Sequence, residues 1–200
     1  WISSLPSGSC KYLTNTIDTS GNGPSKSDRN SPTPKGDIEA AQRVFRLEAE
    51  AMRAIGDNLD ETFMRAVDLI GQATGRTDVT GMGKSGHIAR KISSTLSSTG
   101  TPSFYVHPGE ASHGDLGMIA REDVVLALSN SGETQELGDV INYCRRFNVP
   151  LVSITARLES TLADNSDCTL LLPAIAEACP MGLAPTTSTI GMLAIGNALA

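Results

Sequence analysis

The sequence predicts an α/β protein, built as a three-layer α/β/α sandwich around a five-stranded parallel sheet. From residue 78 onward, short apolar runs rich in β-branched residues alternate with stretches of helical periodicity. That alternation is typical of parallel strands joined by right-handed crossovers. Apolar residues make up 40% of the chain and aromatic residues only 4%, so the core is expected to consist of small aliphatic side chains.

The chain is expected to divide into a disordered leader, residues 1–36, and one domain, residues 37–200. The leader is rich in Ser, Gly, Asn, Thr and Pro and shows no periodicity, so it has too little apolar surface to order itself. The N-terminus lacks the pattern of a signal peptide. None of the four cysteines forms a CxxC pair, and we expect reduced thiols in a cytoplasmic protein.

Two amphipathic helices are expected ahead of the sheet. Asp37 is a candidate N-cap for the first. Its apolar stripe consists of Ile38, Ala41, Val44, Leu47, Ala51 and Ile55. The second helix carries Leu59, Phe63, Val67 and Ile70 and ends near Gly71. Such helices can cover the sheet or pack against a partner subunit, and we expect a homo-oligomer, either a dimer or a tetramer.

Five strands are predicted, at residues 78–80, 103–106, 123–128, 151–155 and 168–172. The first is the weakest prediction, because Asp78 stands where an apolar residue is expected. A helix follows it, with a stripe that includes Ile88 and Ile92, and a final helix begins near Thr187. Ligands of parallel sheets bind at the carboxyl ends of the strands, so the polar loops that follow the strands are the candidate site.

The loop after the third strand has the sequence Ser-Asn-Ser-Gly-Glu-Thr, residues 129–134, and leads into an amphipathic helix. A helix N-terminus presents unpaired N–H groups and the positive end of the helix dipole. Gly132 allows a ligand to approach the backbone, and the flanking hydroxyl groups add donors without adding charge. This loop is therefore a candidate phosphate site. The alternative is an ordinary strand-to-helix turn with a serine cap.

The loop after the first strand, residues 81–86, repeats this pattern and adds Lys84, a cation that can hold a phosphate. It resembles the end of a Walker A loop. The full pattern requires Gly where this chain has Asp78, so we exclude a P-loop nucleotidase. A merely solvated Lys84 remains the alternative.

Further polar groups follow the other strands. The loop of residues 107–115 contains two histidines and two carboxylates, but their spacing matches no common closed metal site, so recognition of a sugar is the better interpretation. Glu136 and Glu177 are carboxylates beside the candidate phosphate site and suit proton abstraction next to a carbonyl. For Glu136, compensation of the helix dipole explains the residue equally well.

Net charge and hydropathy limit the classes of molecule that this protein is expected to bind. The net charge of −6 argues against non-specific binding of nucleic acid. No apolar run approaches the roughly 18 residues of a membrane span. We therefore expect a small-molecule ligand and neither a nucleic acid nor a membrane.

Taken together, these loops resemble the sugar isomerase (SIS) domain of bacterial D-arabinose 5-phosphate isomerases. The likeness runs from about residue 38 to residue 200, and the stretch from Gly-Met-Gly-Lys-Ser-Gly-His to His-Gly-Asp-Leu-Gly-Met is its most specific part. The matching segments are residues 81–86, 100–102, 107–118, 129–133 and 177–189.

The resemblance implies roles for individual residues. Three would be catalytic: Lys84, Glu136 and Glu177. Four residues would hold the phosphate: Ser85, Ser129, Ser131 and Thr134. Asn130 would also bind the substrate. The sugar would be lined by Gly100, Thr101, His107 and His113, with His107 also a site for an inhibitory, non-catalytic zinc.

The resemblance also implies a reaction, the cofactor-free interconversion of D-ribulose 5-phosphate and D-arabinose 5-phosphate through a cis-enediol. This reaction is the entry step to the lipopolysaccharide sugar Kdo. The rivals are isomerisation of another sugar phosphate and a regulatory SIS module that binds a sugar phosphate without turning it over. Lys84, Glu136 and Glu177 together favour an enzyme, because a sensor needs no acid–base pair. The family continues past the last helix into a segment with a further functional histidine and then a pair of CBS domains, neither of which is among these 200 residues.

Overall fold

The computed structural model describes residues 34–174 and 176–200, so almost all of the predicted leader lies outside the described residues. The chain divides into two compact units, residues 1–43 and 44–200. The described part of the first unit is the beginning of helix α1 (Pro34–Asp57). Asp37 lies within the first turn of α1, so the prediction that it caps this helix was wrong. The helix begins at Pro34, four residues before the first residue of its apolar stripe, Ile38.

The two helices ahead of the sheet form as predicted, as α1 and α2 (Glu61–Gln72). The side chain of Asp60 accepts a hydrogen bond from the backbone N of Thr62 and caps α2. The stripes are buried only in part. The buried stripe residues are Ala51 and Ile55 in α1 and Ile70 in α2, and Ala66 of α2, outside the predicted stripe, is buried as well. Large apolar side chains on both helices remain exposed, among them Phe45, Met52, Met64 and Val67.

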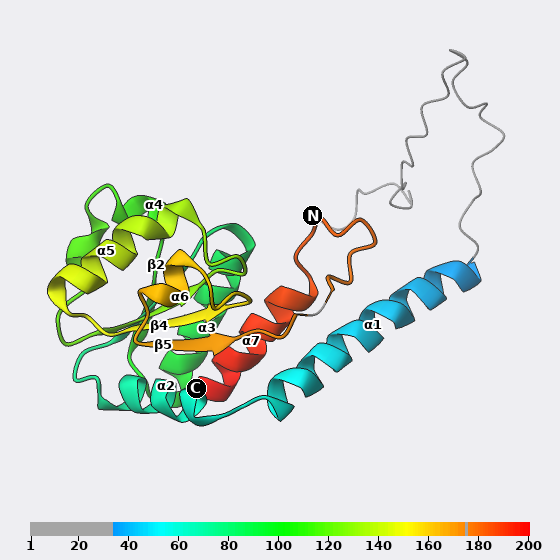
Figure 1. Ribbon diagram of the computed structural model, residues 1–200, viewed down its shortest axis with the longest axis horizontal. Coiled ribbons are helices and arrows are strands. Elements are labelled where there is room, and N and C mark those ends of the chain that lie inside the picture. The colour runs from blue at the N-terminus through cyan, green and yellow to red at the C-terminus, as the bar shows by residue number, and fades with distance from the viewer. Residues whose placement is uncertain (1–33, 175) are drawn as a thin grey trace, which may run out of the picture. The chain divides into compact units, whose positions relative to one another are not determined.

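A five-stranded, all-parallel sheet in the order β2-β1-β3-β4-β5 forms the centre of the second unit (Figure 1). The strands are β1 (Thr77–Gly81), β2 (Ser103–Val106), β3 (Val124–Leu128), β4 (Leu151–Thr155) and β5 (Cys168–Leu171). Each predicted strand agrees with the observed one to within one residue at either end. The predicted fold class is thereby confirmed.

Helices cover both faces of the sheet. One face packs against α2, α3 (Gly83–Thr99) and α7 (Thr187–Leu199), together with Ile55 of α1. The other packs against α4 (Pro108–Ala111), α5 (Gly138–Phe147) and α6 (Thr161–Asp164) (Figure 1). Alternate residues of β3 enter the two cores, as the period of a strand requires. Four short elements were not predicted: α4, α6 and two 3₁₀ turns, η1 (Asp115–Met118) and η2 (Gln135–Leu137), all of them one turn long.

The strand order places the two candidate phosphate loops side by side. β1 and β3 are neighbours although β2 lies between them in sequence, and Gly81 pairs with Leu128 at their carboxyl ends. The direction of strand addition reverses here, which is where open α/β sheets bind ligands. Gly86 allows α3 to pack closely on β1. A Cβ at this position would lie only 2.6 Å from the carbonyl oxygen of Gly81, so a larger residue would push the helix away from the strand.

Asp78 is fully buried in the interior of β1, next to Phe104 of β2 and Val125 of β3. Asp123, at the same end of the sheet, is also buried, and its carboxylate accepts hydrogen bonds from the backbone N atoms of Arg76 and Ala120. A contact with the Asp123 carboxylate helps to hold the proton of Asp78, and the Asp78 oxygens have no hydrogen-bond partner of good geometry among the described residues. The polar residue that made the first strand a weak prediction is therefore a buried carboxyl group with few polar neighbours.

In the part of the chain that the structure describes, the helices are all too short or too polar to cross a bilayer.

Candidate functional site

The loop of residues 129–134 closes on itself through its hydroxyl groups. Ser129 Oγ lies 2.7 Å from Thr134 Oγ1 and accepts a hydrogen bond from the backbone N of Gly132 at 3.0 Å. Ser131 Oγ accepts one from the backbone N of Glu133 at 3.2 Å. Ser129 is buried, whereas Asn130 and Ser131 are exposed. Ser129 therefore braces the loop, and Ser131 can still donate its hydroxyl proton to an anion.

Residues at the start of α6 pack against this loop and form hydrogen bonds with it, an arrangement that we call the clamp. Gly132 has a φ of +69°, and a Cβ there would collide with the side chain of Ser160, the N-cap of α6. The carboxylate of Glu133 accepts hydrogen bonds from Thr161 N at 2.8 Å and Thr161 Oγ1 at 2.7 Å. These bonds lower the pKa of Glu133. The clamp was not predicted, although Ser160-Thr161 is a recognisable helix-start signal.

Lys84 and Ser85 occupy the first turn of α3, directly after β1 and beside the loop of residues 129–134. Lys84 is exposed and Ser85 is half-buried. Gly83 has a φ of +58°, a conformation that glycine adopts without strain. The structure thus brings the two predicted phosphate loops to one edge, with a cation and several hydroxyl groups in adjacent loops.

Glu177 follows β5 and caps α7. Its Oε2 accepts hydrogen bonds from Thr186 N at 2.6 Å, Thr186 Oγ1 at 3.1 Å and Ser188 N at 3.3 Å. Burial raises the pKa of Glu177, but donors from Ser188 and Thr186 outweigh it, so the pKa lies below its ordinary value. Glu177 is therefore an ionised carboxylate at neutral pH.

A cavity of about 70 Å³ joins Glu177 to the phosphate loop. Asn130 contributes to it from the loop after β3, Ala156 from the loop after β4 and Glu177 from the loop after β5. The remaining lining residues are Ala51, Ile55, Leu172, Pro173, Ala174, Thr187, Ser188 and Gly191. Two predicted site residues that are 47 positions apart in the sequence are thus brought together.

Two other predicted catalytic residues do not line this cavity. Lys84 follows β1, which is separated from β5 by β3 and β4. Three strand spacings amount to about 14 Å. Glu136 is exposed in the 3₁₀ turn η2. Of the three predicted catalytic residues, Glu177 is therefore the one that lines this cavity.

Gly100 and Thr101 lie ahead of β2, at the edge of the sheet opposite the carboxyl ends of the strands. Gly100 is the left-handed C-cap of α3, with a φ of +104°, and its N–H bonds to the carbonyl oxygens of Leu96 and Ser97. Within this chain the structure therefore does not bring these two residues to the cavity beside Glu177, and their role in binding the sugar stays a prediction.

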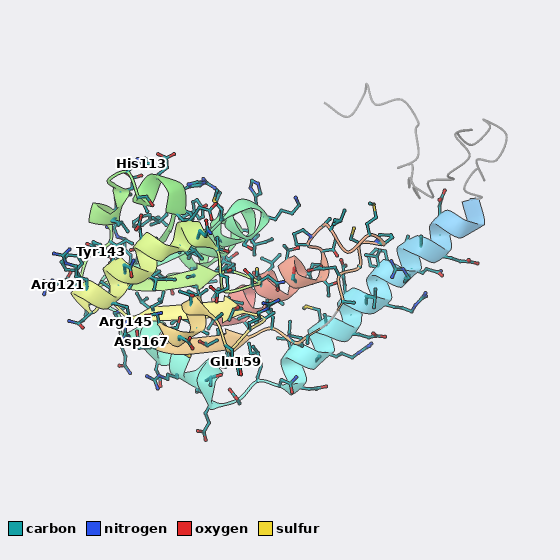
Figure 2. The ribbon with its side chains drawn as sticks, turned by 45° about the horizontal axis from the view of Figure 1, so that its top comes forward. His113, Arg121, Tyr143, Arg145, Glu159 and Asp167 are labelled. Carbon is teal, nitrogen blue, oxygen red and sulfur yellow. The ribbon has the colours of Figure 1, made fainter. Side chains whose placement is uncertain are left out.

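The two histidines lie on the ligand-binding edge but outside the cavity. His107 follows β2, and its Nδ1 accepts a hydrogen bond from the backbone N of Gly109 at 3.2 Å, which caps α4. His113 is exposed in the loop after α4 (Figure 2). Across residues 34–174 and 176–200, no three His, Cys, Asp or Glu side chains are grouped to hold a metal ion. The zinc site at His107 stays a prediction.

Comparisons with known proteins agree with this geometry. Residues 70–200 match the model of the SIS domain. The chain is 48% identical over 162 residues to "Arabinose 5-phosphate isomerase KdsD" of Escherichia coli K12, an alignment that covers 81% of this chain and 49% of that protein. It is 48% identical over 163 residues to the protein of the same name from Pseudomonas aeruginosa, covering 82% and 50%. The chain thus spans about half the length of these curated relatives.

A solved structure, that of E. coli CFT073 c3406 in complex with arabinose 5-phosphate, superimposes with a TM-score of 0.80 at 37% sequence identity. The superposition covers 84% of this chain and 89% of that one. The family model, the relatives and the fold agree, and we conclude that this chain belongs to the SIS domain family.

Proposed function

We propose that this chain is the isomerase domain of an enzyme that interconverts D-ribulose 5-phosphate and D-arabinose 5-phosphate, in the cytoplasm and without a cofactor. The product would feed the synthesis of Kdo for lipopolysaccharide. The names of the relatives support this proposal, as does the arabinose 5-phosphate bound by the structural neighbour.

The observation that carries the proposal is the shared cavity of Asn130 and Glu177. A phosphate held by the loop of residues 129–134, with Lys84 nearby, would fix one end of the open-chain sugar. Its carbon chain would then extend towards Glu177. Binding one end of a short substrate holds the other end in register, and such positioning lowers the barrier to reaction.

Glu177 is the carboxylate best placed to move the proton. Its Oε2 accepts three hydrogen bonds from the start of α7, which fix the side chain, and Oε1 takes part in none of these three. Oε1 would take a proton from C1 of ribulose 5-phosphate and, after the enediol forms, return it to C2, while the proton of the C1 hydroxyl passes to the oxygen on C2. Glu136 is exposed, so the immediate surroundings hold it less firmly.

The direct test is to incubate the natural protein that contains this chain with ribulose 5-phosphate and to follow arabinose 5-phosphate by NMR. Formation of arabinose 5-phosphate supports the proposal. Turnover of a different ketose phosphate in a parallel panel would support another sugar-phosphate isomerase. Tight binding of the pentose phosphate with no turnover would instead support a regulatory sensor.

Replacing Ser131 by Ala is expected to weaken the binding of sugar phosphate by roughly tenfold to a hundredfold, because a hydrogen bond to a charged group contributes about 1.5–3 kcal/mol. The exposed hydroxyl of Ser131 motivates this prediction. Calorimetry gives the affinity. Ser98→Ala, on the exposed surface of α3, is the matched control, since its hydroxyl bonds only to the carbonyl oxygen of Ser94. Equal affinities for both variants would remove this loop from the site.

We also propose that the active unit is a homo-oligomer built through α1 and α2. The exposed apolar side chains of these helices, Phe45 at 72% exposure and Met64 at 60%, favour burial against a second copy. Light scattering at micromolar concentration should show a dimer or tetramer. Phe45→Glu combined with Met64→Glu should dissociate it, whereas Met118→Glu, at an exposed position elsewhere, should not. A monomeric parent protein would contradict this proposal.

A further inference from the structure

The loop of residues 129–134 carries one charged side chain, Glu133, although it is the candidate site for a phosphate. A carboxylate beside a bound phosphate repels it, because like charges at short range raise the energy of the bound state. Glu133 is exposed, so burial does not neutralise it. Its position in an anion-binding loop therefore calls for a physical explanation.

The hydrogen bonds of Glu133 provide one. Its Oε1 accepts a hydrogen bond from Thr161 N at 2.8 Å, and its Oε2 accepts one from Thr161 Oγ1 at 2.7 Å. Both distances are those of strong, charge-assisted hydrogen bonds. The bonds from Thr161 lower the pKa of Glu133, and the positive charge of Arg157 adds to this effect. The charge of Glu133 is thus compensated by the segment that follows β4.

Backbone hydrogen bonds join the same two segments. The carbonyl oxygen of Gly132 accepts a hydrogen bond from Leu162 N at 3.0 Å, and that of Asn130 accepts one from Ala156 N at 3.1 Å. These bonds fix the loop after β3 at residues 130 and 132. Glu133 adds a side-chain connection at the next residue, so the clamp extends along the loop.

Glu133 is also connected to the hydroxyl groups that can bind a phosphate. Its backbone N donates to Ser131 Oγ at 3.2 Å. The next residue is Thr134, whose Oγ1 lies 2.7 Å from Ser129 Oγ. A displacement of the backbone at Glu133 therefore moves these hydroxyl groups. Donors that are already in place bind an anion more tightly, because binding does not have to order them.

We propose that Glu133 is a positioning residue for the sugar phosphate, which holds the loop of residues 129–134 in its anion-binding shape by binding Thr161. The inference rests on the proposed function and deepens it, because it identifies a contact that prepares the phosphate site. Glu133 acts through the loop and does not touch the phosphate. This role explains why a loop that binds an anion carries a negative side chain.

Glu133→Ala tests this role in the natural protein that contains the chain. It should raise the dissociation constants for arabinose 5-phosphate and for inorganic phosphate by about threefold to tenfold, the usual effect of a lost hydrogen bond. The KM should rise by the same factor. The kcat should stay parental, because Glu177 lies in a different loop and weaker binding of the phosphate affects the ground state and the transition state equally.

Glu133→Gln separates the hydrogen bonds from the charge. Its side-chain oxygen can accept from Thr161 N and its NH₂ group can donate to Thr161 Oγ1, so both contacts survive without the charge. We therefore expect Glu133→Gln to bind arabinose 5-phosphate at least as tightly as the parent. If repulsion by the carboxylate were the main effect of Glu133, both Glu133→Ala and Glu133→Gln would bind the sugar phosphate more tightly than the parent.

Glu159→Ala is the matched control for charge. Glu159 is exposed in the segment after β4 (Figure 2) and has no hydrogen bond to the loop of residues 129–134 in the described structure. Its replacement should leave the affinity for arabinose 5-phosphate at the parental value. Glu133→Ala with parental or tighter affinity would overturn the inference. Equal weakening by Glu133→Ala and Glu133→Gln would overturn it as well, because the charge would then matter and the hydrogen bonds would not.

Thr161→Val tests the contact from its other side, because it removes the Oγ1 donor and keeps the backbone N. It should weaken binding by less than Glu133→Ala. The double variant should bind no more weakly than Glu133→Ala alone, since both substitutions remove the same contact. Fully additive losses would contradict the role, as would a Glu133→Ala variant with a lower melting temperature and parental affinity, the result of a purely structural contact.

Failure of the inference and failure of the proposed function give different results. A parent protein that binds arabinose 5-phosphate without isomerising it refutes the reaction, while the dissociation constants of the Glu133 variants still decide the positioning role. A parent protein that isomerises the sugar, with a Glu133→Ala variant of parental affinity, refutes only the positioning role. A parent protein that binds neither arabinose 5-phosphate nor inorganic phosphate by calorimetry refutes both.

Discussion

Glu177→Gln is expected to lower the turnover of ribulose 5-phosphate by about 10²–10⁴-fold, the usual contribution of a positioned general base, while leaving substrate binding nearly intact. The side-chain oxygen of Gln can replace Oε2 and accept the hydrogen bonds of Thr186 and Ser188. Its NH₂ group then stands where Oε1 was. The cap of α7 survives, and only the basic oxygen is lost.

Steady-state kinetics and calorimetry measure the two effects separately. Glu136→Gln is the matched control, and its exposed side chain predicts a much smaller loss of rate. If Glu177→Gln turns over at the parental rate, Glu177 is not the base and Glu136 becomes the next candidate. The parent protein should also incorporate solvent deuterium at C2 of arabinose 5-phosphate, because an enediol exchanges its proton through the base.

The pH dependence of the parent follows from the same carboxylate. The pKa of Glu177 lies below its ordinary value, because hydrogen bonds from Ser188 and Thr186 outweigh the effect of burial. A base with a lowered pKa stays ionised through neutral and mildly acidic solution. We therefore expect kcat/KM to fall on acidification only below the usual carboxyl range. An acid limb near neutral pH would point to a different group.

Asp78→Val is expected to stabilise the protein by several kcal/mol at pH 8, an unusually large gain for one substitution. Burial raises the pKa of Asp78 to about 8, and the negative charge of Asp123 and a hydrogen bond to its carboxylate add to the shift. Apart from this contact, the carboxyl oxygens have no hydrogen-bond partner in the described structure. Val removes the buried carboxyl group and is a residue that favours a central strand.

The sign of the pH effect follows from the direction of the shift. The folded state holds the proton of Asp78 up to about pH 8, whereas the unfolded chain releases it near pH 4. The parent protein therefore loses stability as the pH rises from about 4 to 8, at up to about 1.4 kcal/mol per pH unit. The gain from Asp78→Val should grow over the same range.

Thermal unfolding at pH 5, 6.5 and 8 measures this gain. Asp115→Val, which removes an exposed carboxylate, is the matched control and should show no such growth with pH. Asp78→Asn, which removes the charge but keeps a polar side chain, should give only part of the gain in stability that is expected for Asp78→Val. A lower melting temperature of Asp78→Val at pH 8 would mean that the carboxylate finds a partner in the folded protein.

Much of this protein was predictable from the sequence, because its signals are local. The β-branched runs predicted all the strands to within one residue, since a buried parallel strand needs a short continuous apolar segment. The glycines and hydroxyl residues after β1 and β3 indicated two loops on one edge, and the sheet order places them side by side. The motifs also identified the SIS domain family.

Other features depended on contacts between residues that are far apart in the sequence, and no local pattern reveals such contacts. The sequence offered Glu177 as the first candidate base and Glu136 as the second, and only the order β3-β4-β5 places Glu177 in a cavity with Asn130. Gly100 and Thr101 match the family motif, yet the direction of β2 takes them to the opposite edge.

The same distinction explains Asp78 and the hydroxyl groups at the start of α7. Periodicity and turn chemistry are properties of a few neighbouring residues, so the sequence alone determined the strands, the principal helices and the loops that can bind phosphate. Whether a hydroxyl or carboxyl group finds a hydrogen-bond partner depends on segments that are remote in sequence and meet only when the sheet is assembled. Tertiary structure therefore decided that Thr186 and Thr187 accept hydrogen bonds from the backbone N of Ala178, and that Asp78 is buried beside Asp123 in the interior of the sheet.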